Sequence, residues 1–342
     1  MKPRLRPSLS LALVLLSAAW AVSSCQKEGE TATATDSPSP PPSAAAPGPL
    51  RAVETEETIT ISRGGVPVLV YHKADVPPPE GVDPVFTRSG FIHPLHAPSG
   101  GVVTGIHPED HYHHLGLWHA WVHGEFRGKE VDFWNLKAKT GRVRFVKTLA
   151  VANAADGGAA GFTVEQEQVA FPETAEETVV LREKFTVAAR FDDGANVIDY
   201  TVAQTNVTDA PLVLPAYRYG GGIAYRAPHT WDKDNSDYLT SEGLDRTNSH
   251  TTRARWVAMH GPTESGEATV TLLCDPQNHD APQHVRTWDN GKVFFNYVPI
   301  QETGWEIAPG ATETLRYRLV IADEVAGKAA NEARWEAFAT GN

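Results

Sequence analysis

Apolar and polar residues alternate along most of the chain from about residue 51 onward, with a period of two. This period puts successive side chains on opposite faces of an extended strand, so it predicts strands with one buried face. The clearest runs span residues 178–191, 196–206 and 314–322, and similar runs span 57–61, 66–72, 142–152, 267–274 and 292–300. The pattern therefore predicts an all-β chain.

Turn signals separate many of these runs. Asp-Gly-Gly at 156–158, Asp-Asp-Gly at 192–194 and Asp-Asn-Gly at 289–291 are typical of tight reversals between strands. Only residues 324–339 have the pattern of a helix. About 290 residues with this many long antiparallel strands favour one large β-sandwich over a small barrel. We therefore expect a single β-sandwich domain over residues 51–342, with one C-terminal helix.

The N-terminus differs in composition from the rest. A basic start and an apolar stretch predict a secretory signal peptide over residues 1–24, and the small residues before Cys25 resemble a bacterial lipobox. Residues 25–50 contain six prolines and almost no large apolar side chain, which indicates an extended tether. The alternative is an ordinary signal peptide with a chance cysteine at position 25.

The lipobox resemblance implies a membrane anchor. Two or more acyl chains on Cys25 would hold the protein stably on a lipid bilayer. Gln26, in place of Asp, favours the bacterial outer membrane, with the domain facing the periplasm or the cell surface. The other cysteine, Cys274, lies in a strand-like apolar run and is expected to be a buried, inert thiol.

The bulk charge excludes some partners. The net charge is −12, and it becomes more negative if the basic signal peptide is removed. Such acidity argues against nucleic acid as a partner and is neutral about small ligands. Beyond the signal, no apolar stretch approaches the 18 or so residues that a membrane-spanning helix needs.

The strongest functional signal is the placement of histidine. The chain has 14 histidines, and six of them lie in residues 107–123. Imidazole serves metal ligation, acid–base chemistry near neutral pH, and hydrogen bonding to a polar ligand. We take His111, His113 and His114 as catalytic candidates. One alternative is a metal site built from His107, His111 and His113, although the spacing matches no known zinc signature. The other is a purely structural role for the histidines.

Three further segments offer polar side chains that could surround a ligand. Residues 217–231 are rich in glycine, tyrosine and arginine, and residues 240–256 are rich in charge. Glu302 follows a strand, a position suited to a general base. The residues proposed to contact substrate are His107, Trp118, Trp121, Tyr219, Tyr225, Arg226, Glu242 and Arg246. The alternatives are a glycine-rich strand kink, a charged surface loop and a solvated loop glutamate.

Several of these stretches resemble one family. Residues 110–121, 131–134, 219–226, 240–246, 253–256 and 296–319 are similar to uncharacterised bacterial proteins of the PmoA family, often labelled methane oxygenase-like. The resemblance spans about residues 65–340. It does not imply methane oxidation, because a true membrane methane-oxidising subunit is built of transmembrane helices.

The C-terminal pattern is also similar to the galactose mutarotase-like, or aldose-epimerase, superfamily. Those proteins are β-supersandwiches that hold a sugar in an open cleft, with a late-strand glutamate as base and a histidine as acid. Glu302, followed by Pro309-Gly310, is compatible with that arrangement. The resemblance raises the expectation of a carbohydrate ligand at the level of fold alone.

The leading hypothesis is a lipoprotein that acts on a carbohydrate by acid–base chemistry, as a hydrolase, lyase or epimerase. Glu302 would be the base, and His111, His113 or His114 the acid. The alternatives are a non-catalytic glycan-binding lipoprotein and a metal-dependent enzyme with histidine ligands. The sequence assigns no cofactor, and a divalent metal bound by the histidines is the alternative.

Overall fold

The computed structural model describes residues 48–341. Within them the chain forms twenty strands, one α-helix and two short 3-10 helices, η1 (Pro84–Phe86) and η2 (Leu136–Ala138). The predicted signal peptide, Cys25 and most of the predicted tether lie outside the described residues. The expectation of an all-β fold with large antiparallel sheets and one C-terminal helix is confirmed.

Two eight-stranded sheets and one four-stranded sheet make up the fold, and all the registers are antiparallel. The first sheet runs β1 (Leu50–Glu54), β2 (Thr58–Arg63), β3 (Val66–His72), β4 (Phe91–Leu95), β5 (Leu117–Trp118), β13 (Ala224–Arg226), β18 (Phe294–Val298), β17 (His284–Arg286). The second runs β14 (Asp237–Thr240), β15 (Trp256–Thr263), β16 (Gly266–Cys274), β20 (Thr312–Ala322), β11 (Ala195–Asn206), β10 (Thr178–Asp192), β9 (Ala159–Ala170), β8 (Gly141–Asn153). The third runs β19 (Trp305–Ile307), β12 (Leu212–Leu214), β6 (Gly124–Phe126), β7 (Lys129–Val131).

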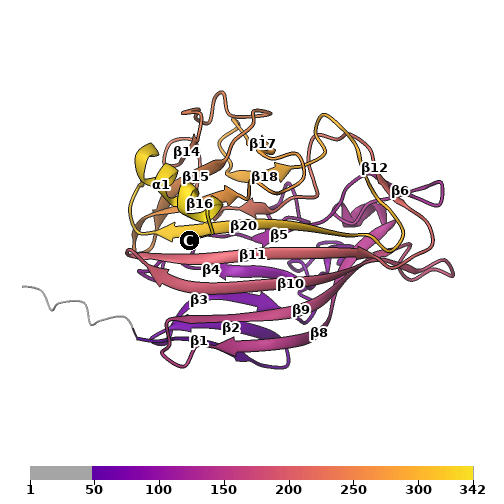
Figure 1. Ribbon diagram of the computed structural model, residues 1–342, viewed down its shortest axis with the longest axis horizontal. Helices are drawn as coiled ribbons and strands as arrows, with labels where there is room; N and C mark the ends of the chain where they lie inside the picture. The colour runs from indigo at the N-terminus through magenta and orange to yellow at the C-terminus, as the bar shows by residue number, and fades with distance from the viewer. Residues whose placement is uncertain (1–47, 342) are drawn as a thin grey trace, which may run out of the picture. The chain divides into compact units, whose positions relative to one another are not determined.

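The long strands are those that the two-residue period predicts. Figure 1 shows β8 to β11 and β20 as long neighbouring ribbons of the second sheet. The predicted reversals also occur: β10 turns into β11 through Asp193 and Gly194, which have φ of 44° and 76°. Positive φ at both positions is the geometry of a type I′ hairpin turn, which matches the twist of the flanking strands.

The first and second sheets pack face to face. Alternate residues of the first sheet, such as Leu117 and Phe295, join Phe185 and Ile198 of the second in one buried cluster. Their strand neighbours point to the opposite face, as the pleat requires. Trp118 and Phe294 thus join a different cluster, together with residues of the third sheet. His114 packs against Trp118 and Phe294 on this opposite face.

The C-terminal helix α1 (Lys328–Ala339) is shorter than expected and lies beside β15 and β16 (Figure 1). Its sequence is rich in alanine and charged helix formers. Trp335 packs on a cluster around Trp256 and donates its indole N–H to the Cys274 carbonyl at 2.9 Å. Cys274 itself is buried, and burial raises the pKa of its thiol to about 12, so it is inert as expected.

Candidate functional site

The histidine-rich segment forms a closed loop instead of an extended strand. The backbone N–H of His107 donates to the carbonyl of His114 at 2.9 Å, and that of His114 donates to the carbonyl of His111 at 2.9 Å. In an extended strand His114 would lie on the opposite face from His111 and His113. The turn instead brings three rings together, with centroids 4.7 Å apart for His111 and His114, 4.8 Å for His113 and His114, and 5.6 Å for His111 and His113.

These three rings line one side of a cavity of about 150 Å³. Four separate parts of the chain build its walls, and all the side chains except one amide are aromatic or cationic. We call it the histidine pocket, lined by His111, His113, His114, Trp134, Asn135, Arg218, Tyr219, Arg286, Trp288 and Phe294. The sequence analysis singled out the histidines and Tyr219 among them and missed the other six.

The aromatic walls hold the histidines in place. The His114 ring stacks on Phe294 with centroids 4.7 Å apart, and Trp288 lies 4.9 Å from His111. On the other side, Tyr219 accepts a hydrogen bond from the Asn135 amide at 2.9 Å. Arg-x-Trp at 286–288 was the available sequence signal for this wall, but only its position beside β18 connects it to the histidines.

Burial keeps the three imidazoles neutral. It lowers the pKa of His113 to about 3, with further contributions from the charges of His111 and Arg88. The pKa of His114 is far below its ordinary value and that of His111 is also lowered, in both cases mainly by burial. At neutral pH the free pocket therefore presents neutral rings, which can accept a proton or exchange hydrogen bonds with a ligand.

Their ring nitrogens are largely unused. His114 Nδ1 is buried without a hydrogen-bond partner, and His113 makes no side-chain hydrogen bond within residues 48–341. His111 Nδ1 lies 3.1 Å from a carboxylate oxygen of Asp110, which also binds Lys292 at 2.6 Å. Buried polar atoms are normally paired, so residues that line a cavity and keep unpaired ring nitrogens are suited to a ligand.

Arg226 supports the pocket from behind. It ends β13, is 3% exposed, and lies 3.8 Å from Asp110 with its guanidinium 5.2 Å from the Trp288 ring centre. Its neighbour Tyr225 points to the opposite face, where its hydroxyl donates to the Val103 carbonyl. Adjacent residues of a strand cannot both face the same site.

The two predicted tryptophans are buried and do not line the pocket. Trp118 packs behind His114 with ring centroids 5.2 Å apart. Trp121 donates its indole N–H to Gln204 at 3.0 Å and lies under Gly221, where an added Cβ would come within 2.0 Å of its ring. The glycine-rich segment therefore serves close packing here. Residues 119–123 form no strand.

His107 and the two residues of the charged loop also lie outside the lining. His107 is 6% exposed, and its Nδ1 lies 2.7 Å from the Tyr112 carbonyl oxygen, so it braces the loop. Arg246 is buried and donates to Ser236 at 2.7 Å and to the Trp288 carbonyl at 3.4 Å. Glu242 is exposed and accepts from Ser241 at 3.1 Å.

Glu302 lies in a different cluster. Its carboxylate contacts Arg253 at 3.0 Å and His284 at 3.3 Å, and its side chain is 63% exposed. The hydrogen bond from Arg253 and the charge of His284 lower its pKa, so it is ionised near neutral pH. His284 and Arg286 share one face of β17, and their Cα atoms are roughly 7 Å apart along the strand. No contact between Glu302 and the three histidines is present in the described residues.

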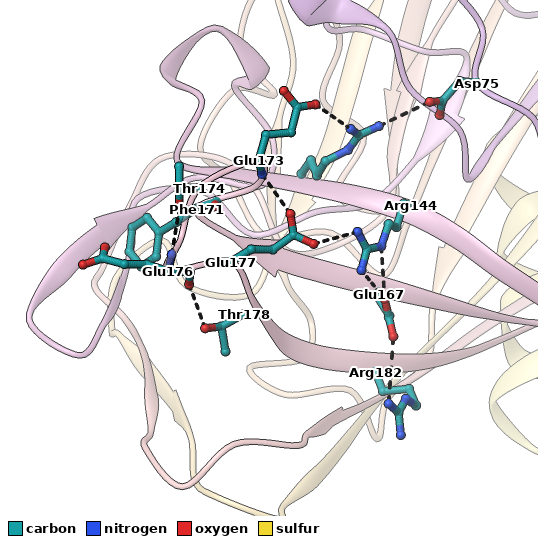
Figure 2. A network of polar contacts seen from close by, with 11 residues as sticks. Asp75, Arg144, Glu167, Phe171, Glu173, Thr174, Glu176, Glu177, Thr178 and Arg182 are labelled. Atoms are coloured by element: carbon teal, nitrogen blue, oxygen red, sulfur yellow. Dashed lines mark hydrogen bonds and ion pairs between the residues drawn. The ribbon is translucent and has the colours of Figure 1, made fainter.

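A larger cavity, of about 440 Å³, lies on the other side of residues 134–136. Its wall includes Arg142, which contacts Asp75 at 3.4 Å and Glu173 at 3.7 Å, so these charges satisfy one another. Figure 2 shows the continuing network, in which Arg144 contacts Glu177 and Glu167 at the base of the β9–β10 loop. This network has the character of surface ion pairs.

Residues 48–341 contain no group of three or more His, Cys, Asp or Glu side chains arranged to hold a metal ion. The predicted ligands His107, His111 and His113 accordingly do not form one. Within the same residues no helix is long and apolar enough to cross a membrane.

The fold and site define an all-β protein with a histidine- and aromatic-lined pocket on the outer face of one sheet. The chain belongs to DUF6807, a family of unknown function, whose model matches residues 58–336. The comparisons give no support to the PmoA label. No curated protein matches the chain.

Among solved structures, the chain is similar to a polysaccharide lyase at 13% identity and a TM-score of 0.32, covering 83% of this chain and 34% of that one. It is similar to a galactose mutarotase related enzyme from Lactobacillus acidophilus at 11% identity and a TM-score of 0.35, covering 81% and 100%. A heparan sulfate lyase from Pedobacter heparinus matches at 9% identity and a TM-score of 0.34, covering 79% of this chain and 34% of that one. The chain thus spans about a third of either lyase, and these similarities are too weak to assign an activity.

Proposed function

We propose that the histidine pocket binds one sugar residue and that the protein acts on it by acid–base chemistry. The observation that carries this is the meeting of three neutral imidazoles, with unused ring nitrogens, and an aromatic wall. Aromatic faces pack against the apolar side of a sugar ring, and neutral imidazoles exchange hydrogen bonds with hydroxyls. A cavity of about 150 Å³ is smaller than the roughly 300–1,000 Å³ typical of drug-sized ligand sites, which suits one ring.

The protonation states change the roles first expected for the residues. A histidine that is neutral in the free pocket acts as a proton acceptor or a hydrogen-bond donor before it acts as an acid. We place the proton transfer at His113, because its ring lines the pocket and is not engaged by hydrogen bonds with the described residues. Glu302 would take part only if the substrate extends over β17 toward His284.

The test is a substrate panel with three readouts on one sample. New reducing ends indicate hydrolysis, ultraviolet absorbance of an unsaturated product indicates elimination, and exchange of sugar proton signals in NMR indicates epimerisation. His113→Ala should lower turnover by about 100-fold, within the range that general acid–base catalysis contributes. Glu302→Gln separates the two catalytic candidates.

His96→Ala is the matched control. His96 has Nδ1 2.9 Å from the Gly100 carbonyl oxygen and lies outside the pocket lining, so this variant should keep its turnover. Unchanged turnover in folded His113→Ala would overturn the catalytic assignment.

The second candidate is a non-catalytic glycan-binding protein. The pKa of about 3 for His113 favours it, because a catalytic base works best with a pKa near the working pH. Calorimetry followed by chromatography of the same mixture decides between the two: binding without product supports this candidate, and product rejects it. The metal-dependent alternative predicts about one equivalent of a transition metal in protein purified without a histidine tag.

We also propose that the protein is a lipoprotein held on the outer membrane through acylated Cys25. The support is the lipobox-like sequence before Cys25 and the proline-rich segment after it. Labelled palmitate should enter the intact protein and not Cys25→Ala, and the variant should leave the membrane fraction. Membrane association that persists in the variant without label would reject this proposal.

A further inference from the structure

Two arginines of the histidine pocket have no counter-charge. Within residues 48–341, no carboxylate oxygen lies within 4.0 Å of the guanidinium of Arg218 or Arg286. Several other arginines in this part of the chain also have no carboxylate within that distance, but Arg218 and Arg286 are the two that line the histidine pocket. Elsewhere Arg144 and Arg253 each contact a carboxylate at 3.0 Å, and Arg318 does so at 2.6 Å.

The two cations are held close to each other. Both approach the ring of Tyr219, with guanidinium carbons 5.3 Å (Arg286) and 5.8 Å (Arg218) from its centre. Burial and then the charge of Arg218 lower the pKa of Arg286. Like charges that face a cavity repel each other, and an anion bound between them would remove that repulsion.

The nearest acidic groups are already engaged or lie elsewhere. Asp132 accepts from the backbone N–H of Trp134 at 2.9 Å and of Asn135 at 2.7 Å. Asp110 is bound by Lys292, and Asp289 does not line the pocket. The lining of the histidine pocket therefore contains two arginines and no carboxylate.

We infer that the sugar bound in the histidine pocket carries an anionic group, a carboxylate or a sulfate ester, and that Arg218 and Arg286 hold it. The fork of a guanidinium matches the oxygens of both groups with paired, charge-assisted hydrogen bonds. In this arrangement Trp288 contacts the ring and the histidines face its hydroxyls. The inference rests on the proposed function and narrows its substrate class to acidic glycans.

The experiment is calorimetry on the full domain with three probes of matched length: an oligogalacturonate, a sulfated galactose oligosaccharide and the neutral galactose oligosaccharide. Arg218→Gln and Arg286→Gln should each weaken binding of an acidic probe by about tenfold, and the double variant by about 100-fold, with weaker binding at higher salt. Arg286→Lys keeps the charge without the fork and should fall between. Arg127→Gln, at an exposed arginine paired with Asp209, is the control and should bind as the parent does.

The outcomes separate the two proposals. Preference for the oligogalacturonate identifies a carboxylate, and preference for the sulfated probe identifies a sulfate ester. Equal binding of the neutral probe that depends on His113 and not on the arginines overturns this inference and leaves the proposed function standing. Binding of inorganic sulfate alone through both arginines supports the anion site and counts against a sugar. No binding of any probe overturns both.

Discussion

His119 and the histidines of the pocket lie on opposite faces of the first sheet, and they use their ring nitrogens differently. His119 lies between the two large sheets, with Nε2 3.0 Å from Glu183 and Nδ1 2.6 Å from the Tyr200 hydroxyl. In the histidine pocket, His114 Nδ1 has no partner and His113 makes no side-chain hydrogen bond among the described residues. Both groups come from one histidine-rich segment, so local sequence does not separate them.

The network around His119 has the character of a structural core. Both oxygens of Glu183, which is fully buried, accept hydrogen bonds, and the donors besides His119 are Gln166 at 3.0 Å, Gln168 at 2.7 Å and Gln204 at 2.6 Å. A buried network whose donors and acceptors are all paired stabilises one arrangement of the two sheets. Unpaired donors and acceptors beside a cavity are instead available to a ligand. The His119 network is therefore expected to contribute to stability, whereas the pocket histidines fit the binding role proposed above.

Replacing His119 and His114 in turn by phenylalanine tests this difference most strongly. His119→Phe should lower the free energy of unfolding by about 3–5 kcal/mol, because it removes the imidazole that pairs with the buried Glu183 carboxylate at 3.0 Å. Urea denaturation measures this. Glu176→Gln is the control, since Glu176 is exposed and paired with Lys129 at 2.7 Å. A loss below about 1 kcal/mol for His119→Phe would remove the structural role.

His114→Phe should have the opposite profile. The ring already stacks on Phe294 among aromatic neighbours, and the substitution removes a buried nitrogen that has no partner. Stability should stay within about 1 kcal/mol of the parent or rise. Binding of the best probe should weaken at least tenfold in calorimetry. A folded variant with unchanged binding would show that His114 only packs.

The pH dependence of stability should separate the groups by window. His113 has a pKa of about 3 in the folded protein against 6.5 for an ordinary histidine. Below about pH 6.5 the unfolded chain therefore binds more protons than the folded one, and stability decreases as the pH is lowered. Burial alone would raise the pKa of Glu183, but His119 and the glutamines outweigh it and lower it to about 2. Its contribution to stability is lost only below about 4.5.

Thermal melts between pH 8 and 3 measure both windows. His113→Asn should make the profile less steep from about pH 6.5 down to about 3. Glu183→Gln should flatten only the part below about pH 4.5. A His113→Asn profile that overlays the parent would contradict the lowered pKa of His113.

The smallest effect is expected in the ion-pair network of Figure 2. Arg144 contacts Glu167 and Glu177 at 3.0 Å each, but about a third of its side chain is exposed to solvent. Arg144→Gln should therefore lower stability by about 1 kcal/mol or less, with the difference shrinking at high salt. A larger loss, insensitive to salt, would give this network a structural weight comparable with that of Glu183.

The long strands could be predicted because each buries one face over many residues. The pattern even contained a sign of the core network. Glu183 lies on the buried face of β10, at a position between Leu181 and Phe185 where the alternation predicts an apolar residue. Strand β9 was missed because Gln166 and Gln168 occupy its buried positions. Polar residues that point inward erase the alternation on which strand prediction depends.

Except for β18, the strands near the pocket could not be predicted in the same way. β5, β13 and β17 have only two or three residues, too few to show a period. Arg226 was chosen together with Tyr225, yet the pleat sends them to opposite faces. Arg286 and Trp288 join the histidines only because β17 pairs with β18.

The sequence by itself determined the all-β architecture, the position of the main reversals and the segment that supplies the histidines, because these depend on local periodicity and composition. Only the tertiary structure decided which histidines line the histidine pocket and which face the core. That choice follows from a loop closed by the His107–His114 hydrogen bond and from partners up to about 180 residues away, such as Phe294. Long-range contacts of this kind leave no periodic trace in the chain.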